Sequence, residues 1–194
     1  MSDFSNYIEP TGCNEGLDWL DQWRSKGFSL LDYVLPIDEI NAAREDLKLL
    51  IAERPNKVTD DFGGFSFPFS KPSLNNIVLH KNILNIAKQA LQAEVLLSQG
   101  EAWAKVVQER SKFGNQDQRI HMDYPNHTLI HPPRWEEPNV IAMILYFDDV
   151  DICGGPTAVV QREGDDDPAY KPPYVNMPGV GKHPWINDRE TTEV

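Results

Sequence analysis

The residues best suited to chemistry are His121 and Asp123, which are separated by one residue. Side chains at positions i and i+2 of a strand point to the same face, so a short strand here would present an imidazole and a carboxylate together. These groups are two corners of the 2-His-1-carboxylate arrangement, which binds Fe(II) and leaves positions open for a 2-oxo acid and dioxygen. The motif is short enough to arise by chance in an acid-rich chain, so a solvent-exposed pair at a strand end is the alternative.

The first half of the chain is predicted to be helical. Leu17, Leu20 and Trp23 fall on one helical face, and Gly27 follows as a left-handed cap. Apolar residues then recur at near-3.6 spacing over residues 37–51, with Arg44 among the side chains predicted to face water. A third helix is predicted over residues 79–92, and the segment 57–73 is predicted to be loop.

The second half is predicted to be rich in strands. Candidate strands cover residues 94–98, 102–108, 118–123, 140–147 and 157–160. Residues 140–147 (VIAMILYF) form an apolar run without alternation, which is typical of a strand buried on both faces. The remainder, residues 161–194, is predicted to be loop.

Composition limits the classes of protein to consider. The chain has 194 residues, 40% of them hydrophobic, which suits a single globular domain. A net charge of −12 argues against a general nucleic-acid binder. Cys13 and Cys153 are too few for a disulfide scaffold, and reduced thiols are expected. Neither a signal peptide nor a membrane span is apparent, so a cytoplasmic location is expected.

Several segments, taken in order, resemble the phytanoyl-CoA dioxygenase family. The stretch LDQWRSKGFSLLDYVLPIDEINAAREDLKLL is similar to the family's first helix, its short strand after a glycine and aromatic residue, and its second helix. The stretch LHKNILNIAKQAL resembles the helix before the barrel. HMD is followed by NVIAMILYFDDVDICGGPTAVV, which resembles the family's apolar strand, acidic turn and next strand. The resemblance extends over residues 17–160.

This resemblance implies an α+β fold in one domain, with helices over about residues 14–92 and a double-stranded β-helix (a cupin-like jelly roll) over about residues 93–194. It implies an Fe(II)- and 2-oxoglutarate-dependent dioxygenase that hydroxylates a small organic molecule, with dioxygen as co-substrate. His121 and Asp123 would be iron ligands, and Lys105 and Gln108 are the polar side chains available for the 2-oxoglutarate pocket. Family members that halogenate carry a small residue in place of the carboxylate, so Asp123 favours hydroxylation.

The C-terminal part departs from the family pattern. A segment similar to PGSH is replaced by VVQREGDDDP, and neither the distal histidine nor the arginine about ten residues after it lies where the family has them. His183 precedes a proline in a loop-like segment, and Arg189 does not restore the spacing. Five candidate strands also fall short of the roughly eight in a jelly roll. We therefore expect an N-terminal portion of a longer protein, or a truncated, inactive homologue acting as a binding or structural module.

Other metal-capable residues have simpler interpretations. His127 and His131 are four apart, as in a helical zinc site, but the prolines around them argue against a helix. A loop at the mouth of the site, in which Arg134 and Trp135 contact substrate, is the favoured interpretation. The run Asp165–Asp167 suggests a solvated turn more than a calcium loop, because it lacks the spaced ligands of such a loop.

Overall fold

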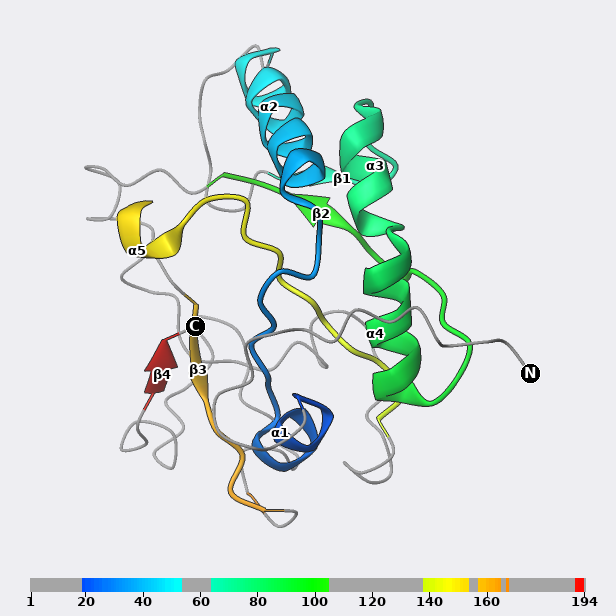
Figure 1. The fold of residues 1–194 in the computed structure, drawn as a ribbon, viewed down its shortest axis with the longest axis vertical. Coiled ribbons are helices and arrows are strands. Elements are labelled where there is room, and N and C mark those ends of the chain that lie inside the picture. Colours follow the sequence, from blue (N-terminus) through cyan, green and yellow to red (C-terminus); the bar gives the residue numbers. More distant parts are fainter. Residues whose placement is uncertain are drawn as a thin grey trace, which may run out of the picture. The chain divides into compact units, whose positions relative to one another are not determined.

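The computed structural model combines helices with small antiparallel sheets (Figure 1). It describes residues 19–53, 64–104, 138–153, 157–164, 167 and 191–193. The chain divides into two compact units, which are treated separately below. The first unit comprises Met1–Leu17, Leu30–Lys105 and Leu145–Asp148, and the second comprises Asp18–Ser29, Val106–Ile144 and Asp149–Val194.

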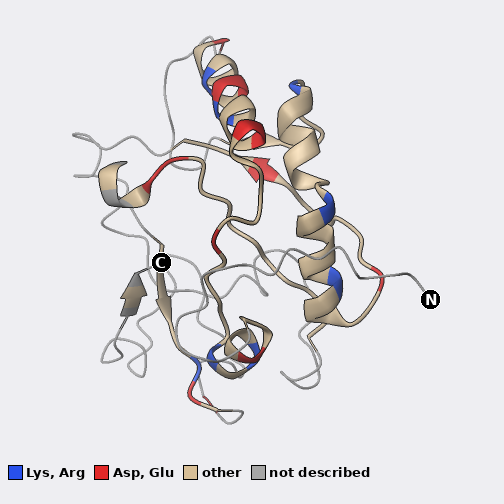
Figure 2. Cartoon of the chain, viewed as in Figure 1, with Lys and Arg blue, Asp and Glu red and all other residues tan. Residues whose placement is uncertain are grey.

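The core of the first unit is centred on α2 (Ile37–Glu53) and α3 (Pro72–Val78), which pack against each other. Helix α2 buries Ala43, Leu47 and Leu50, which recur at intervals of four and three residues. Its other side carries acidic and basic side chains along its length (Figure 2). The largest fully buried side chains among the described residues, Leu74 and Ile77, come from α3. These apolar contacts are the main source of stability in this unit.

The start of α3 is fixed by a proline and an asparagine. Pro72 occupies the first turn, where its missing N–H leaves no bond unmade. The Asn75 side chain accepts a hydrogen bond from the Phe69 backbone N–H at 2.8 Å and donates one to the Phe69 carbonyl, also at 2.8 Å. Asn75 therefore satisfies both backbone groups of Phe69, a buried residue.

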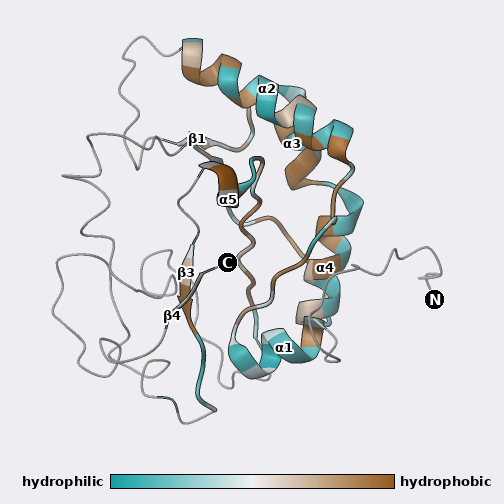
Figure 3. Ribbon diagram, turned by 60° about the vertical axis from the view of Figure 1, so that its left-hand side comes forward, coloured by the Kyte–Doolittle hydropathy of each residue, from teal (hydrophilic) through white to brown (hydrophobic). Residues whose placement is uncertain are grey.

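Helix α4 (Lys81–Leu91) is the most amphipathic helix in the described part of the chain, and its apolar residues form a face (Figure 3). The buried residues Ile83, Ile86, Ala87 and Ala90 follow the helical repeat. The prediction of a helix over residues 79–92 is confirmed, with the helix shorter by two residues at the start and one at the end. Gln92 ends it in a left-handed conformation, with φ of 51°.

Two residues from each of two distant segments form a small sheet in the first unit. Strand β1 (Phe65–Ser66) pairs antiparallel with β2 (Glu101–Ala102), with Phe65 opposite Ala102. The Phe67 N–H extends the ladder by donating to the Gly100 carbonyl at 2.8 Å. The segment 57–73 was predicted to be loop, but β1 and the start of α3 lie within it. Pairing with residues far along the chain cannot be read from local sequence.

The second unit contains α1 (Trp19–Lys26), α5 (Val150–Cys153) and a sheet of β3 (Ala158–Val160) with β4 (Thr191–Glu193). Gly27 ends α1 with φ of 86°, and its N–H donates to the Trp23 carbonyl at 2.9 Å, so the predicted glycine cap is confirmed. The strand predicted at 157–160 is also confirmed. Strand β4 lies in a segment predicted to be loop, and only its pairing with β3 reveals it.

Three other expectations are wrong. The strand predicted at residues 94–98 is absent. The short strand that the family resemblance implies between Gly27 and the second helix is absent too, and Tyr33 there has a left-handed φ of 56°. Residues 140–147 form no strand either, and no described strand is hydrogen-bonded to them in a sheet. Instead of being buried on both faces, this run is half-buried, with Ile144 57% exposed. Apolar composition favours a strand only where a neighbouring strand can take its hydrogen bonds.

Candidate functional site

The predicted site residues lie outside the described residues. This holds for the proposed iron ligands His121 and Asp123 and for Lys105 and Gln108, which were assigned to the cofactor pocket. It holds equally for the alternative metal-binding and substrate-contacting residues, namely His127, His131, Arg134, Trp135, His183 and Arg189. Their roles stay predictions. The described chain stops at Ala104 and resumes at Pro138, so its nearest well-defined features are β2 and the segment that follows Pro138.

Strand β2 leads directly toward Lys105 and is closely packed. A Cβ atom placed on Gly64 would lie 3.3 Å from the Ala102 carbonyl oxygen and 3.7 Å from the Trp103 side chain. A Cβ atom on Gly100 would lie 3.1 Å from the Phe67 Cβ. A larger side chain at either position would crowd the neighbouring segment, which would have to shift slightly. The chain is therefore held in place immediately before the segment that contains the predicted site.

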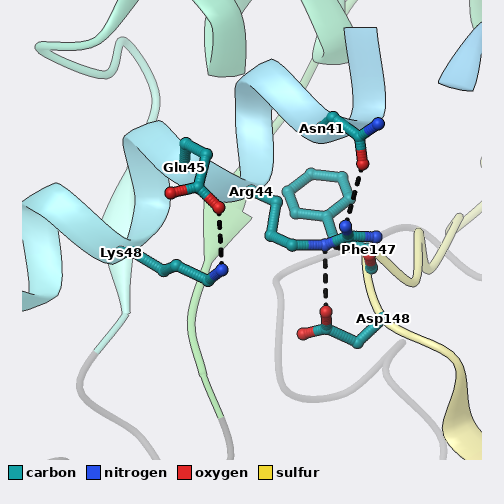
Figure 4. A network of polar contacts seen from close by, with 6 residues as sticks. All are labelled: Asn41, Arg44, Glu45, Lys48, Phe147 and Asp148. Atoms are coloured by element: carbon teal, nitrogen blue, oxygen red, sulfur yellow. Dashed lines mark hydrogen bonds and ion pairs between the residues drawn. The ribbon is translucent and has the colours of Figure 1, made fainter. Parts of the chain in front are cut away.

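The other segment is anchored at Phe147 and Asp148 by Arg44 of α2 (Figure 4). Arg44 Nε donates to the Phe147 carbonyl at 2.6 Å and lies 2.9 Å from Asp148 Oδ1. Arg44 Nη2 also donates to the Phe147 carbonyl, and Nη1 donates to Asn41 Oδ1 at 2.9 Å. The guanidinium group thus holds together the end of the apolar run and the acidic turn after it.

Arg44 had been predicted to face water, and its real position corrects that expectation. Its side chain is 27% exposed, whereas that of its partner Asp148 is 64% exposed. Helical spacing contained the signal, because Arg44 lies four residues after Ile40 and three before Leu47, within the apolar stripe of α2. A charged residue inside such a stripe indicates a partner on another segment.

A second polar cluster joins the start of α4 to α2 and to the segment before it. His80 caps α4, because its Nδ1 atom accepts a hydrogen bond from the Asn82 backbone N–H at 3.2 Å. An Nδ1 atom that accepts belongs to the tautomer with its proton on Nε2, which lies 3.7 Å from Glu39 Oε2. The Asn82 side chain donates to the Val34 carbonyl at 2.7 Å. This cluster fixes the start of α4 and has no arrangement that indicates catalysis.

Two features that would point to a function are absent from the described part of the chain. No group of three or more His, Cys, Asp or Glu side chains suited to holding a metal ion occurs there. Nor does any helix in these segments have the length and apolar character to cross a lipid bilayer.

Comparison of the chain with protein-family models, with curated proteins and with solved structures gives no match. The function proposed below therefore depends on the residues of this chain and on their order.

Proposed function

We propose that this chain is an Fe(II)- and 2-oxoglutarate-dependent oxygenase related to the phytanoyl-CoA dioxygenase family, and that it hydroxylates a small organic molecule. The observation that carries the proposal is the order of elements around His121 and Asp123: helices first, then His-Met-Asp, an apolar run and a Gly-Gly-Pro turn before a strand. Helices α1, α2 and α4 and strand β3 lie at the positions that this order requires, which supports the proposal. A double-stranded β-helix around the metal and a cytoplasmic location belong to the same proposal.

The donor set fits the metal. An imidazole and a carboxylate are suitable ligands for Fe(II), and His121 and Asp123 would supply them. When bound, iron with 2-oxoglutarate and dioxygen supplies the oxidising power, and 2-oxoglutarate leaves as succinate and carbon dioxide. The Asp123 carboxylate would occupy a position that halogenating relatives leave free for halide. Lys105 and Gln108 would offer polar contacts to 2-oxoglutarate.

The test is an anaerobic titration of the 194-residue chain with Fe(II) and 2-oxoglutarate, followed by measurement of succinate once dioxygen is admitted. We expect one Fe(II) bound per chain, with binding and succinate formation lost in Asp123→Ala. Asp32→Ala is the matched control, because Asp32 is an exposed carboxylate remote in sequence from the motif. Succinate formation that persists in Asp123→Ala at the wild-type rate would show that Asp123 is not a ligand.

The departures in the C-terminal part favour one alternative, a catalytically inactive homologue that acts as a binding or structural module. VVQREGDDDP replaces the family's segment after the barrel strand, and His183 is the only histidine after position 131. The same titration separates the two proposals. A folded wild-type chain that binds no Fe(II) in the presence of 2-oxoglutarate supports the inactive module and contradicts the enzyme.

A further inference from the structure

Arg162 is a buried cation that follows β3 in the second unit. Only 6% of its surface is exposed, and its Nε atom is buried without a hydrogen-bond partner. Its backbone is held firmly, since the Arg162 N–H donates to the Lys26 carbonyl at 2.8 Å. Nothing in the proposed iron site involves this residue.

Glu163 and Asp167 are the described acids nearest to Arg162 in sequence. Glu163 is exposed. Asp167 is buried, with 2% of its surface exposed, and its Oδ2 atom accepts a hydrogen bond from the Glu163 backbone N–H at 2.8 Å. Among the residues that the structure describes, no carboxylate lies within ion-pair distance of the Arg162 guanidinium. The buried charge therefore has no counter-ion in this part of the chain.

A buried guanidinium favours an anionic ligand. Arginine stays charged under all conditions in which proteins fold, so it cannot lower the cost of burial by losing its proton. A charge removed from water requires a partner of opposite sign or strong hydrogen-bond acceptors. The planar fork of N–H donors matches the two oxygens of a carboxylate or of a phosphate.

We propose that Arg162 forms a binding site for the oxyanion group of a small molecule, a carboxylate or a phosphate, which accepts hydrogen bonds from its guanidinium. The site is formed where β3 ends, with the Arg162 backbone held by the Lys26 carbonyl. In a chain with a net charge of −12, a buried guanidinium is one of the few groups suited to an anion. The proposal does not depend on iron binding at His121 and Asp123.

The test observes the unpartnered atom directly. The full chain, with chelator present and no iron, is labelled with ¹⁵N and ¹³C, and the Nε–H resonance of Arg162 is assigned through its own side-chain carbons. Inorganic phosphate and propionate are then titrated separately at constant ionic strength. We expect a saturable shift of this resonance with at least one anion. Phosphate alone would identify a phosphate-bearing ligand, and propionate alone would identify a carboxylate.

Variants provide the second measurement. Arg162→Gln should weaken binding of the effective anion at least tenfold, whereas Lys48→Gln, which removes an exposed positive charge from α2, should bind as wild type. If Arg162→Gln fails to fold, Arg162→Lys keeps the charge, loses the planar fork and should still bind more weakly. An Arg162 resonance that responds to neither anion, or equal affinity in wild type and the Arg162 variants, would overturn the proposal.

Discussion

Arg44 of α2 binds the backbone carbonyl of Phe147, which lies 103 residues further along the chain. The same guanidinium pairs with Asp148, so one side chain holds two consecutive residues of a distant segment (Figure 4). This contact joins the helical first half to the end of the apolar run that follows the predicted site in sequence. Residues 140–147 have no strand partner among the described residues, and Arg44 is one restraint on where this run ends.

Replacing Arg44 by methionine should destabilise the first unit. Methionine keeps a long apolar stem but loses every donor, leaving the Phe147 carbonyl without the charged group that binds it. Hydrogen bonds to charged groups contribute about 1.5–3 kcal/mol, and the exposed Asp148 pair adds less than about 1 kcal/mol. We expect the free energy of unfolding, measured by urea denaturation, to fall by about 1–3 kcal/mol.

Lys48→Met is the matched control for this variant. Lys48 lies on the same helix and pairs with Glu45 at 2.8 Å, but both side chains are largely exposed. An exposed pair at this spacing contributes only about 0.3–0.5 kcal/mol. Equal losses in the two variants would show that the contact to residues 147 and 148 contributes nothing specific.

Asn75→Ala should destabilise α3 because two buried backbone groups of Phe69 lose their partner. Leaving a buried donor and acceptor unsatisfied costs about 1–3 kcal/mol. Asn75→Asp should also be destabilising, since a carboxylate can accept from the Phe69 N–H but repels the Phe69 carbonyl. Asn85→Ala in α4 is the control, where alanine is a better helix former and unfolding should be unchanged or slightly harder. If the free energy of unfolding of Asn75→Ala is no lower than that of Asn85→Ala, the hydrogen bonds between Asn75 and Phe69 contribute nothing to stability.

Leu74→Ala should be the most damaging of the simple truncations. Leu74 is 1% exposed and lies at the contact of α3 with α2, so the truncation leaves a cavity. Such changes cost about 2–5 kcal/mol. Leu96→Ala removes the same atoms from a side chain that is 96% exposed, and we expect its free energy of unfolding in urea to match wild type within about 0.5 kcal/mol. Comparable losses of stability in the two variants would show that Leu74 is not part of the core.

Helices α1, α2 and α4 were predictable because their information is local, whereas α3 and α5 were not predicted. The apolar stripes of α2 and α4 and the glycine that ends α1 are visible in windows of a few residues, and all three helices occur. The stripe of α2 was placed imperfectly. Ile37 was expected to be buried but is exposed, while Ala43 is fully buried, so the inward face is rotated away from Ile37 toward Ala43.

Strands were predicted less well because pairing depends on segments far apart in the chain. Strands β1 and β4 occur in segments whose composition indicates loop, and each is defined by a partner at least thirty residues away. Conversely, VIAMILYF has the composition of a strand but no partner strand in the described part of the chain. The prediction that His121 and Asp123 point to the same face also assumes a strand. A strand depends on pairing with a distant segment, so this arrangement stays a prediction.

Comparing His80→Ala with His80→Asn tests whether the cap or the neighbouring contact with Glu39 stabilises α4. The cap satisfies the Asn82 N–H, and removing an N-terminal cap costs about 0.5–2 kcal/mol. Asparagine can accept the same hydrogen bond, so His80→Asn should retain most of the stability and His80→Ala should not. Glu39→Gln removes the charge 3.7 Å from Nε2 and keeps the cap, so its effect should stay below about 1 kcal/mol. Hydrogen exchange of the Asn82 amide locates the effect. It should accelerate in His80→Ala and stay slow in Glu39→Gln, whereas the reverse order would assign the stabilisation to the contact with Glu39.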